Sequence, residues 1–119
     1  MCLGGFIFKH KNTKAQRKIK RDMSNGYIYI LTNPSIRGVK IGFTTRATKK
    51  RAMELSKPTG VPGRYSVAYE KYVNNCKKVE KLIHKNLLKY RTDPRKEHFD
   101  IDLDHAKREV DRIISQYIV

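Results

Sequence analysis

The feature that most constrains the fold is a pair of short segments in which apolar and polar residues alternate. They are residues 26–31 (GYIYIL) and 39–44 (VKIGFT), and the Asn-Pro-Ser and Gly between them favour a turn. Because neighbouring side chains in a strand point to opposite faces, one face collects aliphatic residues and the other collects polar ones. The second face carries Tyr29, Lys40 and Gly42. The pattern predicts a β-hairpin whose polar chemistry lies on one face.

The rest of the chain supplies signals for three helices and further strands. Two Pro and two Gly between residues 58 and 63 end the first helix, and Asp102 is a suitable cap for the last one. With 119 residues there is room for one core. We expect an α/β fold, a small three-stranded, mostly antiparallel sheet flanked by helices, in a single domain. The expected elements are strands at 26–32, 39–43, 65–73 and a short one at 97–101, and helices at 48–57, 76–90 and 103–117.

The net charge of +16 is unevenly distributed along the sequence. Residues 37–96 hold 17 Lys and Arg against four acids, a net charge of +13, whereas residues 97–119 have a net charge of −3. A field of this kind attracts a polyanion, and nucleic acid is the commonest one. We expect DNA as the partner, with RNA as a disfavoured alternative. A basic surface that only keeps the protein soluble is the plainer interpretation.

Residues 1–24 have the composition of a basic tail, and residues 25–119 form the expected domain. All seven Lys and Arg of the tail lie between residues 9 and 21, with no acid among them. The tail could follow a nucleic-acid backbone, or it could be a solvated extension without a role. The apolar run at its start is too short for a signal peptide or a membrane span. We therefore expect a protein that is not secreted and contacts no membrane. Cys2 and Cys76 lie far apart in the sequence, so we expect no disulfide framework, which fits an intracellular protein.

The hairpin and the basic segment after it resemble the GIY-YIG nuclease superfamily. Tyr27-Ile28-Tyr29 stands at the first motif, Lys40-Ile41-Gly42 at the second, and Arg51 follows on the next helix. The resemblance covers roughly residues 25–115 and follows the order of a phage-type branch, which is described as a DNA-binding domain and often sits at the end of larger phage or viral proteins. The other matching segments are Asn33-Pro34-Ser35, Thr44-Thr45-Arg46, Glu54-Leu55, Thr59-Gly60-Val61-Pro62, Glu80 to His84, Tyr90-Arg91 and Glu97-His98-Phe99.

The resemblance implies an endonuclease that hydrolyses DNA phosphodiester bonds with one divalent ion, Mg²⁺ or Mn²⁺. Carried over by position, Tyr29 and less directly Tyr27 would position or deprotonate the water. Arg51 would stabilise the phosphate, and Glu80 would hold the ion, which suits Mg²⁺ because it accepts one carboxylate plus substrate oxygens. His84, one helical turn from Glu80, is a further catalytic candidate.

Lys40 stands where the second motif usually has a tyrosine. An ammonium group cannot deprotonate water unless its pKa is lowered, but it could hydrogen-bond the nucleophile or lower the pKa of Tyr29. Two interpretations follow: a metal-dependent nuclease, or a non-catalytic DNA-binding module that retains the fold. In both, five basic side chains are expected to contact nucleic acid: Arg46, Lys49, Lys50, Lys57 and Arg91.

Each candidate residue also has a plainer explanation. Tyrosines are enriched in strands anyway, and Arg51 belongs to a Lys-Lys-Arg run that could be a solvated helix face. Glu80 could simply pair with Lys77 or His84 at helical spacing. Glu80 with His84 could also begin a zinc site, but no further ligand has suitable spacing. For the nuclease we expect Tyr29, Lys40, Arg51 and Glu80 to converge on the face opposite the aliphatic stripe.

Overall fold

The computed structural model describes residues 24–58, 60–92 and 97–117. Its elements are β1 (Gly26–Asn33), β2 (Ile36–Thr44), α3 (Thr48–Ser56), β3 (Ser66–Val73), α4 (Cys76–Asn86), the 3₁₀ turn η1 (Leu88–Tyr90), β4 (His98–Phe99) and α5 (Leu103–Ile114). The basic tail at residues 1–23 lies outside the described residues. No helix of the described part is long and apolar enough to cross a membrane.

The sheet has four antiparallel strands in the order β3-β1-β2-β4, so the expectation of three strands is wrong. The fourth strand is only two residues long and pairs Phe99 with Val39 and His98 with Lys40. Gly38 permits this approach, because a Cβ there would lie 2.1 Å from the Phe99 carbonyl oxygen and its φ is +84°. The single α/β domain flanked by helices agrees with the expectation.

The turn between β1 and β2 is held by the side chain of Asn33. Its Oδ1 accepts a hydrogen bond from the Ser35 amide at 2.9 Å, and its Nδ2 donates to the Pro62 carbonyl at 2.7 Å. Asx turns of this kind replace a backbone turn with a side-chain bond. The buried Asn33 thus joins the hairpin to the loop between α3 and β3.

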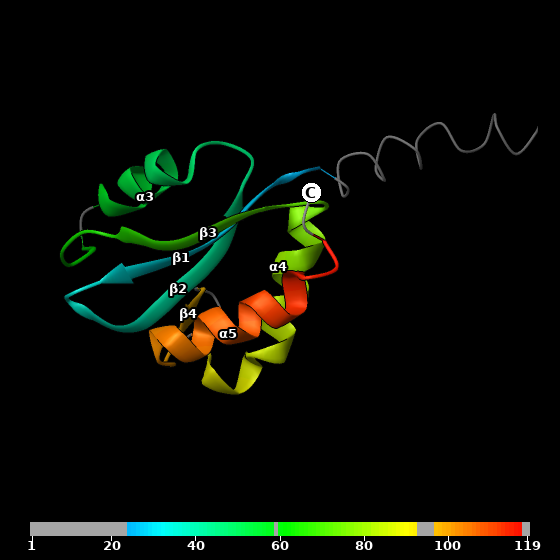
Figure 1. The fold of residues 1–119 in the computed structure, drawn as a ribbon. Helices are drawn as coiled ribbons and strands as arrows, with labels where there is room; N and C mark the ends of the chain where they lie inside the picture. The colour runs from blue at the N-terminus through cyan, green and yellow to red at the C-terminus, as the bar shows by residue number, and fades with distance from the viewer. Residues whose placement is uncertain (1–23, 59, 93–96, 118–119) are drawn as a thin grey trace, which may run out of the picture.

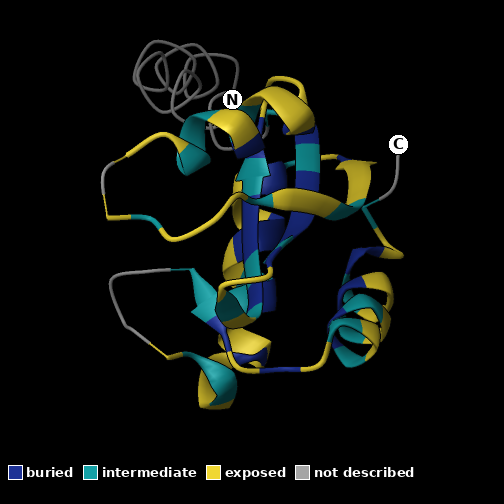
Figure 2. Ribbon diagram, turned by 90° about the vertical axis from the view of Figure 1, so that its left-hand side faces the viewer, coloured by how far each residue is buried: buried dark blue, intermediate teal, exposed yellow. Residues whose placement is uncertain are grey.

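Helices cover both faces of the sheet (Figure 1). On one face, Ile28, Ile30, Val39 and Ile41 pack with buried residues of α4 and α5 in the main core. On the other face, Tyr29 and Leu31 pack with Ala52 of α3 in a smaller core. The alternation predicted from the sequence is confirmed. Figure 2 shows the buried residues concentrated along the central strands, between exposed helix surfaces.

The helix ends differ in part from the expected ones. The expected helix at 76–90 ends at Asn86, because Leu87 leaves helical geometry with φ −104° and ψ 14°, and η1 follows. The last helix ends at Ile114 instead of residue 117. Its predicted cap is confirmed, since the Asp102 side chain accepts hydrogen bonds from the amides of Asp104 and His105.

Candidate active site

The candidate site is built around Gly42, which lies directly opposite Tyr29 in the β1–β2 pairing. A Cβ on Gly42 would lie 2.6 Å from the Tyr29 hydroxyl oxygen and 2.8 Å from Glu97 Oε2. Gly42 is not among the glycines with positive φ, so its backbone does not require glycine. The residue is small because the tyrosine hydroxyl and a carboxylate occupy the space where its side chain would be.

Lys40 and Glu97 form an ion pair beside this point. Lys40 Nζ lies 3.6 Å from Glu97 Oε2, and the two side chains are 11% and 37% exposed. The main chain of Glu97 is fixed as well, because its carbonyl accepts a hydrogen bond from the Ile41 amide at 3.0 Å. Burial lowers the pKa of Lys40, and the carboxylate of Glu97 opposes that shift. Lys40 is therefore a poorly hydrated cation whose charge the Glu97 carboxylate stabilises.

Glu80 reaches the same site from α4. Its side chain is buried, with 9% of the residue exposed, and its Oε2 has no hydrogen-bond partner among the described residues. Burial raises the pKa of Glu80 to about 8, and the neighbouring carboxyl of Glu97 adds to the rise, while Lys40 and Arg91 oppose it. A buried oxygen without a partner is costly unless another group comes to it.

Tyr29 and Arg51 complete the cluster. Burial raises the pKa of Tyr29 to about 12, Glu97 adds to the rise, and the Arg51 guanidinium beside the hydroxyl opposes it. The pKa of Tyr29 is raised overall because burial outweighs the lowering by Arg51, and the suggestion that Lys40 lowers it stays a prediction. Arg51 also lies 3.5 Å from Glu54 on the same helix.

The structure brings together Tyr29, Lys40, Arg51 and Glu80, although their helices come from opposite layers. Arg51 and Glu80 both lie close enough for their charges to shift the pKa values of Tyr29 and Lys40. We expected one face of the sheet to supply all four. Instead α3 lies on the tyrosine face and α4, which carries Glu80, lies on the aliphatic face. One turn after Glu80, His84 of the same helix contacts the Ile41 carbonyl, just beyond the two residues of β2 that β4 covers.

His84 lies at the edge of β2, in a backbone contact. Its Nε2 is 2.9 Å from the Ile41 carbonyl oxygen, and because a carbonyl only accepts, Nε2 is the donor. Its ring packs edge-on against Phe99 with centroids 5.0 Å apart. Burial lowers the pKa of His84. The imidazole thus closes the β2 edge where β4 ends, and its catalytic role stays a prediction.

Tyr27 packs against the neighbouring strand β3. It pairs with Thr44 on β2 and with Tyr72 on β3, and the two tyrosine rings meet edge to face at 5.2 Å between centroids. The Tyr27 side chain is on the same face of β1 as Tyr29, which lies two residues further along the strand. Its predicted role as a second hydroxyl at the site is not tested by this position.

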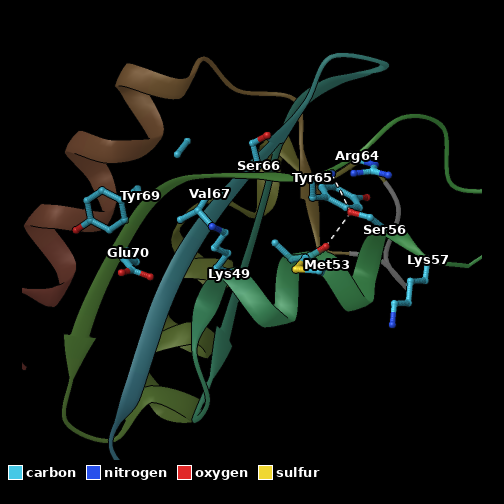
Figure 3. A pocket seen from close by; sticks show the side chains of 12 residues that line it. Lys49, Met53, Ser56, Lys57, Arg64, Tyr65, Ser66, Val67, Tyr69 and Glu70 are labelled. Atoms are coloured by element: carbon cyan, nitrogen blue, oxygen red, sulfur yellow. Dashed lines mark hydrogen bonds between the residues drawn. The ribbon is translucent and has the colours of Figure 1, made fainter.

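Four of the five predicted nucleic-acid contacts lie in α3 or next to its ends, and Arg91 follows η1. Arg46 binds both carboxylate oxygens of Glu54, at 2.7 and 3.0 Å. Lys50 is exposed, and Arg91 lies near enough to Glu80 to affect its pKa. Lys49 and Lys57 line a groove of about 870 Å³ between α3 and β3, which Figure 3 shows.

The groove between α3 and β3 is distinct from the site around Gly42. Its basic rim includes Arg64 besides the two lysines, and its apolar lining includes Met53 and Val67, which are 60% and 37% exposed. None of the four converging residues lines it. A basic rim over apolar side chains suits a nucleic-acid chain, whose phosphates and bases make different contacts.

Glu80 fits a hard divalent cation better than zinc. Its unpartnered Oε2 is the type of ligand that Mg²⁺ and Mn²⁺ prefer, and Mg²⁺ commonly takes only one or two carboxylates from the protein. Within the described ranges, no group of three or more His, Cys, Asp or Glu side chains is arranged to hold a metal ion. When bound, such an ion would polarise a phosphate oxygen and offset its charge.

Sequence reasoning missed Glu97 as a site residue. The Glu-His-Phe segment was noted as part of the resemblance, but Glu97 lies at the start of the acidic end of the chain, where single acids are common. The pairing of His98 with Lys40, which places the preceding residue beside Ile41 and Gly42, becomes visible only in the folded chain.

Comparison with known proteins gives one match. The T5orf172 domain, a family of phage-associated, nuclease-like or DNA-binding domains, matches residues 26–116. No curated protein and no solved structure matches the chain. The match covers the hairpin, α3, β3, α4, β4 and α5, and therefore every residue of the site around Gly42. The chain belongs to the T5orf172 domain family.

Proposed function

We propose that this T5orf172 domain is a GIY-YIG-type endonuclease that hydrolyses DNA phosphodiester bonds with a divalent cation. The observation that carries the proposal is the gathering of a hydroxyl, two cations and a buried carboxylate around Gly42. Phosphodiester hydrolysis requires a positioned water, a proton acceptor and positive charge at the phosphate. These side chains include a candidate for each requirement.

Arg51 and Glu80 have the simplest roles. The Arg51 guanidinium is half-buried beside the Tyr29 hydroxyl, where it can neutralise charge that develops on the phosphate. Glu80 would hold the cation through its unpartnered oxygen. The cation supplies positive charge at the phosphate and at the leaving oxygen.

Lys40 is the better candidate for accepting the proton of the attacking water. The pKa of Tyr29 is raised to about 12, so its hydroxyl keeps its proton near neutral pH and serves to orient the water. The pKa of Lys40 is shifted the other way, by burial, so its neutral amine becomes more accessible. The lysine in the second motif is therefore compatible with hydrolysis.

The surrounding surface suits a DNA substrate. Residues 37–96 carry a net charge of +13, and this range includes α3, β3 and α4. Contacts to phosphates carry no sequence information by themselves. We infer that the domain binds DNA mainly through its backbone, with weak sequence preference.

The alternative is a DNA-binding module without catalysis. The ion pair between Lys40 and Glu97 favours it, because each side chain satisfies the other and the pair would stabilise the fold without any reaction. The two functions differ in one property, since only the nuclease loses an activity when Arg51 is removed while DNA remains bound.

A supercoiled-plasmid nicking assay with Mg²⁺ or Mn²⁺ separates the two functions. We expect Arg51→Ala and Glu80→Ala to lower the nicking rate by about a hundredfold to a thousandfold, with DNA affinity largely kept. Arg112→Ala and Glu109→Ala are matched controls, because these residues form an exposed pair on α5. Absence of nicking by the wild type over a broad pH range, with intact DNA binding, would establish the binding module instead.

A further inference from the structure

We propose that Glu97 is a second carboxylate ligand of the divalent cation, so that Glu80 of α4 and Glu97 beside β4 hold the ion between them. The inference rests on the proposed function, which places an ion at Glu80. It adds a residue from a different element. Glu97 lies beside Gly42 and Lys40, and Glu80 lies close to both Glu97 and Lys40.

The position of Glu97 is determined by the backbone. The Ile41 amide donates to its carbonyl at 3.0 Å, and the next residue pairs with Lys40 in the sheet. Its Oε2 lies 2.8 Å from the point where a Cβ of Gly42 would be, and the Tyr29 hydroxyl lies 2.6 Å from the same point. The carboxylate and the hydroxyl that the proposed reaction uses therefore lie around the same point.

Glu80 supplies the independent sign of a ligand. It is nine-tenths buried, and one of its carboxylate oxygens has no partner in the described part of the chain. Its carboxyl group faces Glu97, and each acid therefore lies in the field of the other. Two carboxyl groups this close and this poorly solvated cannot both be ionised unless positive charge lies between them, and without it Glu80 keeps a proton that hydrogen-bonds the two acids.

The side chains already present do not supply enough of that charge. Lys40 pairs with Glu97 at 3.6 Å, and it leaves the Oε2 of Glu80 without a partner. Lys40 and Arg91 both lie near Glu80, and their charges do not offset its burial and the nearness of Glu97. A divalent cation between the acids would satisfy the unpartnered oxygen and balance the second charge, and two protein carboxylates are within the usual number for Mg²⁺.

The test is the binding of Mn²⁺ to the whole chain without DNA, followed by the electron paramagnetic resonance signal of free Mn²⁺. We expect one site in the wild type, and a loss of affinity of at least about tenfold in both Glu80→Gln and Glu97→Gln, since even outer partners of metal ligands contribute that much. Glu109→Gln is the matched control, because it removes one exposed carboxylate on α5 and should leave binding unchanged.

Thermal unfolding with and without Mn²⁺ shows whether a variant is folded. Without metal, a cooperative unfolding transition of Glu97→Gln shows that the variant is folded, since the substitution removes both the acid next to Glu80 and the ion-pair partner of Lys40. The variant should lose the rise in melting temperature that Mn²⁺ gives the wild type. A variant that is folded and still binds Mn²⁺ like the wild type would overturn the role of Glu97.

The outcomes distinguish this inference from the nuclease itself. If the wild type nicks DNA and Glu97→Gln keeps full Mn²⁺ affinity, the proposed nuclease activity is supported, but Glu97 is not a ligand of the ion. If the wild type binds Mn²⁺ through both acids but never nicks DNA, the ion site is supported and the nuclease function is excluded. A wild type that binds no Mn²⁺ overturns the inference.

Discussion

Replacing Gly42 with alanine should damage the site more selectively than any change of a charged residue. The substitution adds one methyl group and no charge. That methyl group would lie 2.6 Å from the hydroxyl oxygen and 2.8 Å from Cζ of Tyr29, and 2.8 Å from Glu97 Oε2. Heavy atoms do not approach this closely, so either the tyrosine ring or the carboxylate has to move.

The cost can be estimated from how tightly each neighbour is held. Tyr29 is 1% exposed and packs with Leu31 and Ala52 in the smaller core, so its ring has little room to shift. Overpacking a site of this kind costs about 1–3 kcal/mol. For a domain of this size each kcal/mol lowers the melting temperature by roughly 4–8 °C, which gives a decrease of about 5–20 °C.

The effect on catalysis should be larger than the loss of stability alone explains. A displacement of about 1 Å in a positioning group can cost about a hundredfold in rate. We therefore expect Gly42→Ala to lower the plasmid nicking rate by about that factor at a temperature where the variant is fully folded. DNA affinity should be nearly unchanged, because no cation is lost.

Gly60→Ala is the matched control for Gly42→Ala. A Cβ on Gly60 would meet no atom within 4 Å, but its φ of +94° is one that alanine rarely adopts. The control should lose about 1–2 kcal/mol through backbone strain and keep its nicking activity. If Gly42→Ala keeps both the melting temperature and the nicking rate of the wild type, the space around Gly42 is not as crowded as the structure indicates. The placement of Tyr29 and Glu97 around Gly42 would then be wrong.

Three further outcomes follow from the charges of the site. Without metal, the wild type should lose stability as pH rises from about 4.5 to 8, because the pKa of Glu80 is raised in the folded state and the buried carboxyl loses its proton in that range. Glu80→Gln has no such proton to lose, so its free energy of unfolding relative to the wild type, measured by urea unfolding in chelator, should increase over the same range. In Lys40→Arg the increase of nicking rate with pH should disappear, because a guanidinium keeps its proton; a pH–rate profile showing the same increase would exclude Lys40 as the acceptor. DNA affinity in a binding titration should fall with salt, and log K should decrease by roughly 0.9 per phosphate contacted for each tenfold rise in salt concentration. An affinity independent of salt would contradict phosphate contacts from the basic residues 37–96.

The local part of the fold could be predicted from the sequence. Alternation places Ile28 and Ile41 on one face of the hairpin and Tyr29 on the other, and the two cores confirm it. The cap at Asp102 and the end of α3 before Pro58 also depend on neighbouring residues alone. Such features depend on interactions within a few residues, which a sequence displays directly.

A short strand was expected at 97–101, but its place as the fourth strand of the sheet and the role of Glu97 could not be predicted in the same way. A strand of two residues is too short to show an alternating pattern, and it forms because β2 offers its edge at Val39 and Lys40. The approach of Phe99 also depends on the positive φ of Gly38, some 60 residues earlier in the chain. The nearness of Glu80 to Glu97 likewise depends on the packing of a whole helix.

Lys40 and Glu97 are best understood as a linked pair. Lys40 is 11% exposed, and a buried ammonium without a partner would be costly, whereas Glu97 without Lys40 would face Glu80 uncompensated. In a double-mutant cycle without metal, Lys40→Met should cost more free energy of unfolding than Lys40→Met combined with Glu97→Gln. The coupling between the two sites should be about 0.5–3 kcal/mol. Additive effects would show that the two charges stabilise the fold independently, and that the lysine of the second motif does not depend on the acid beside β4.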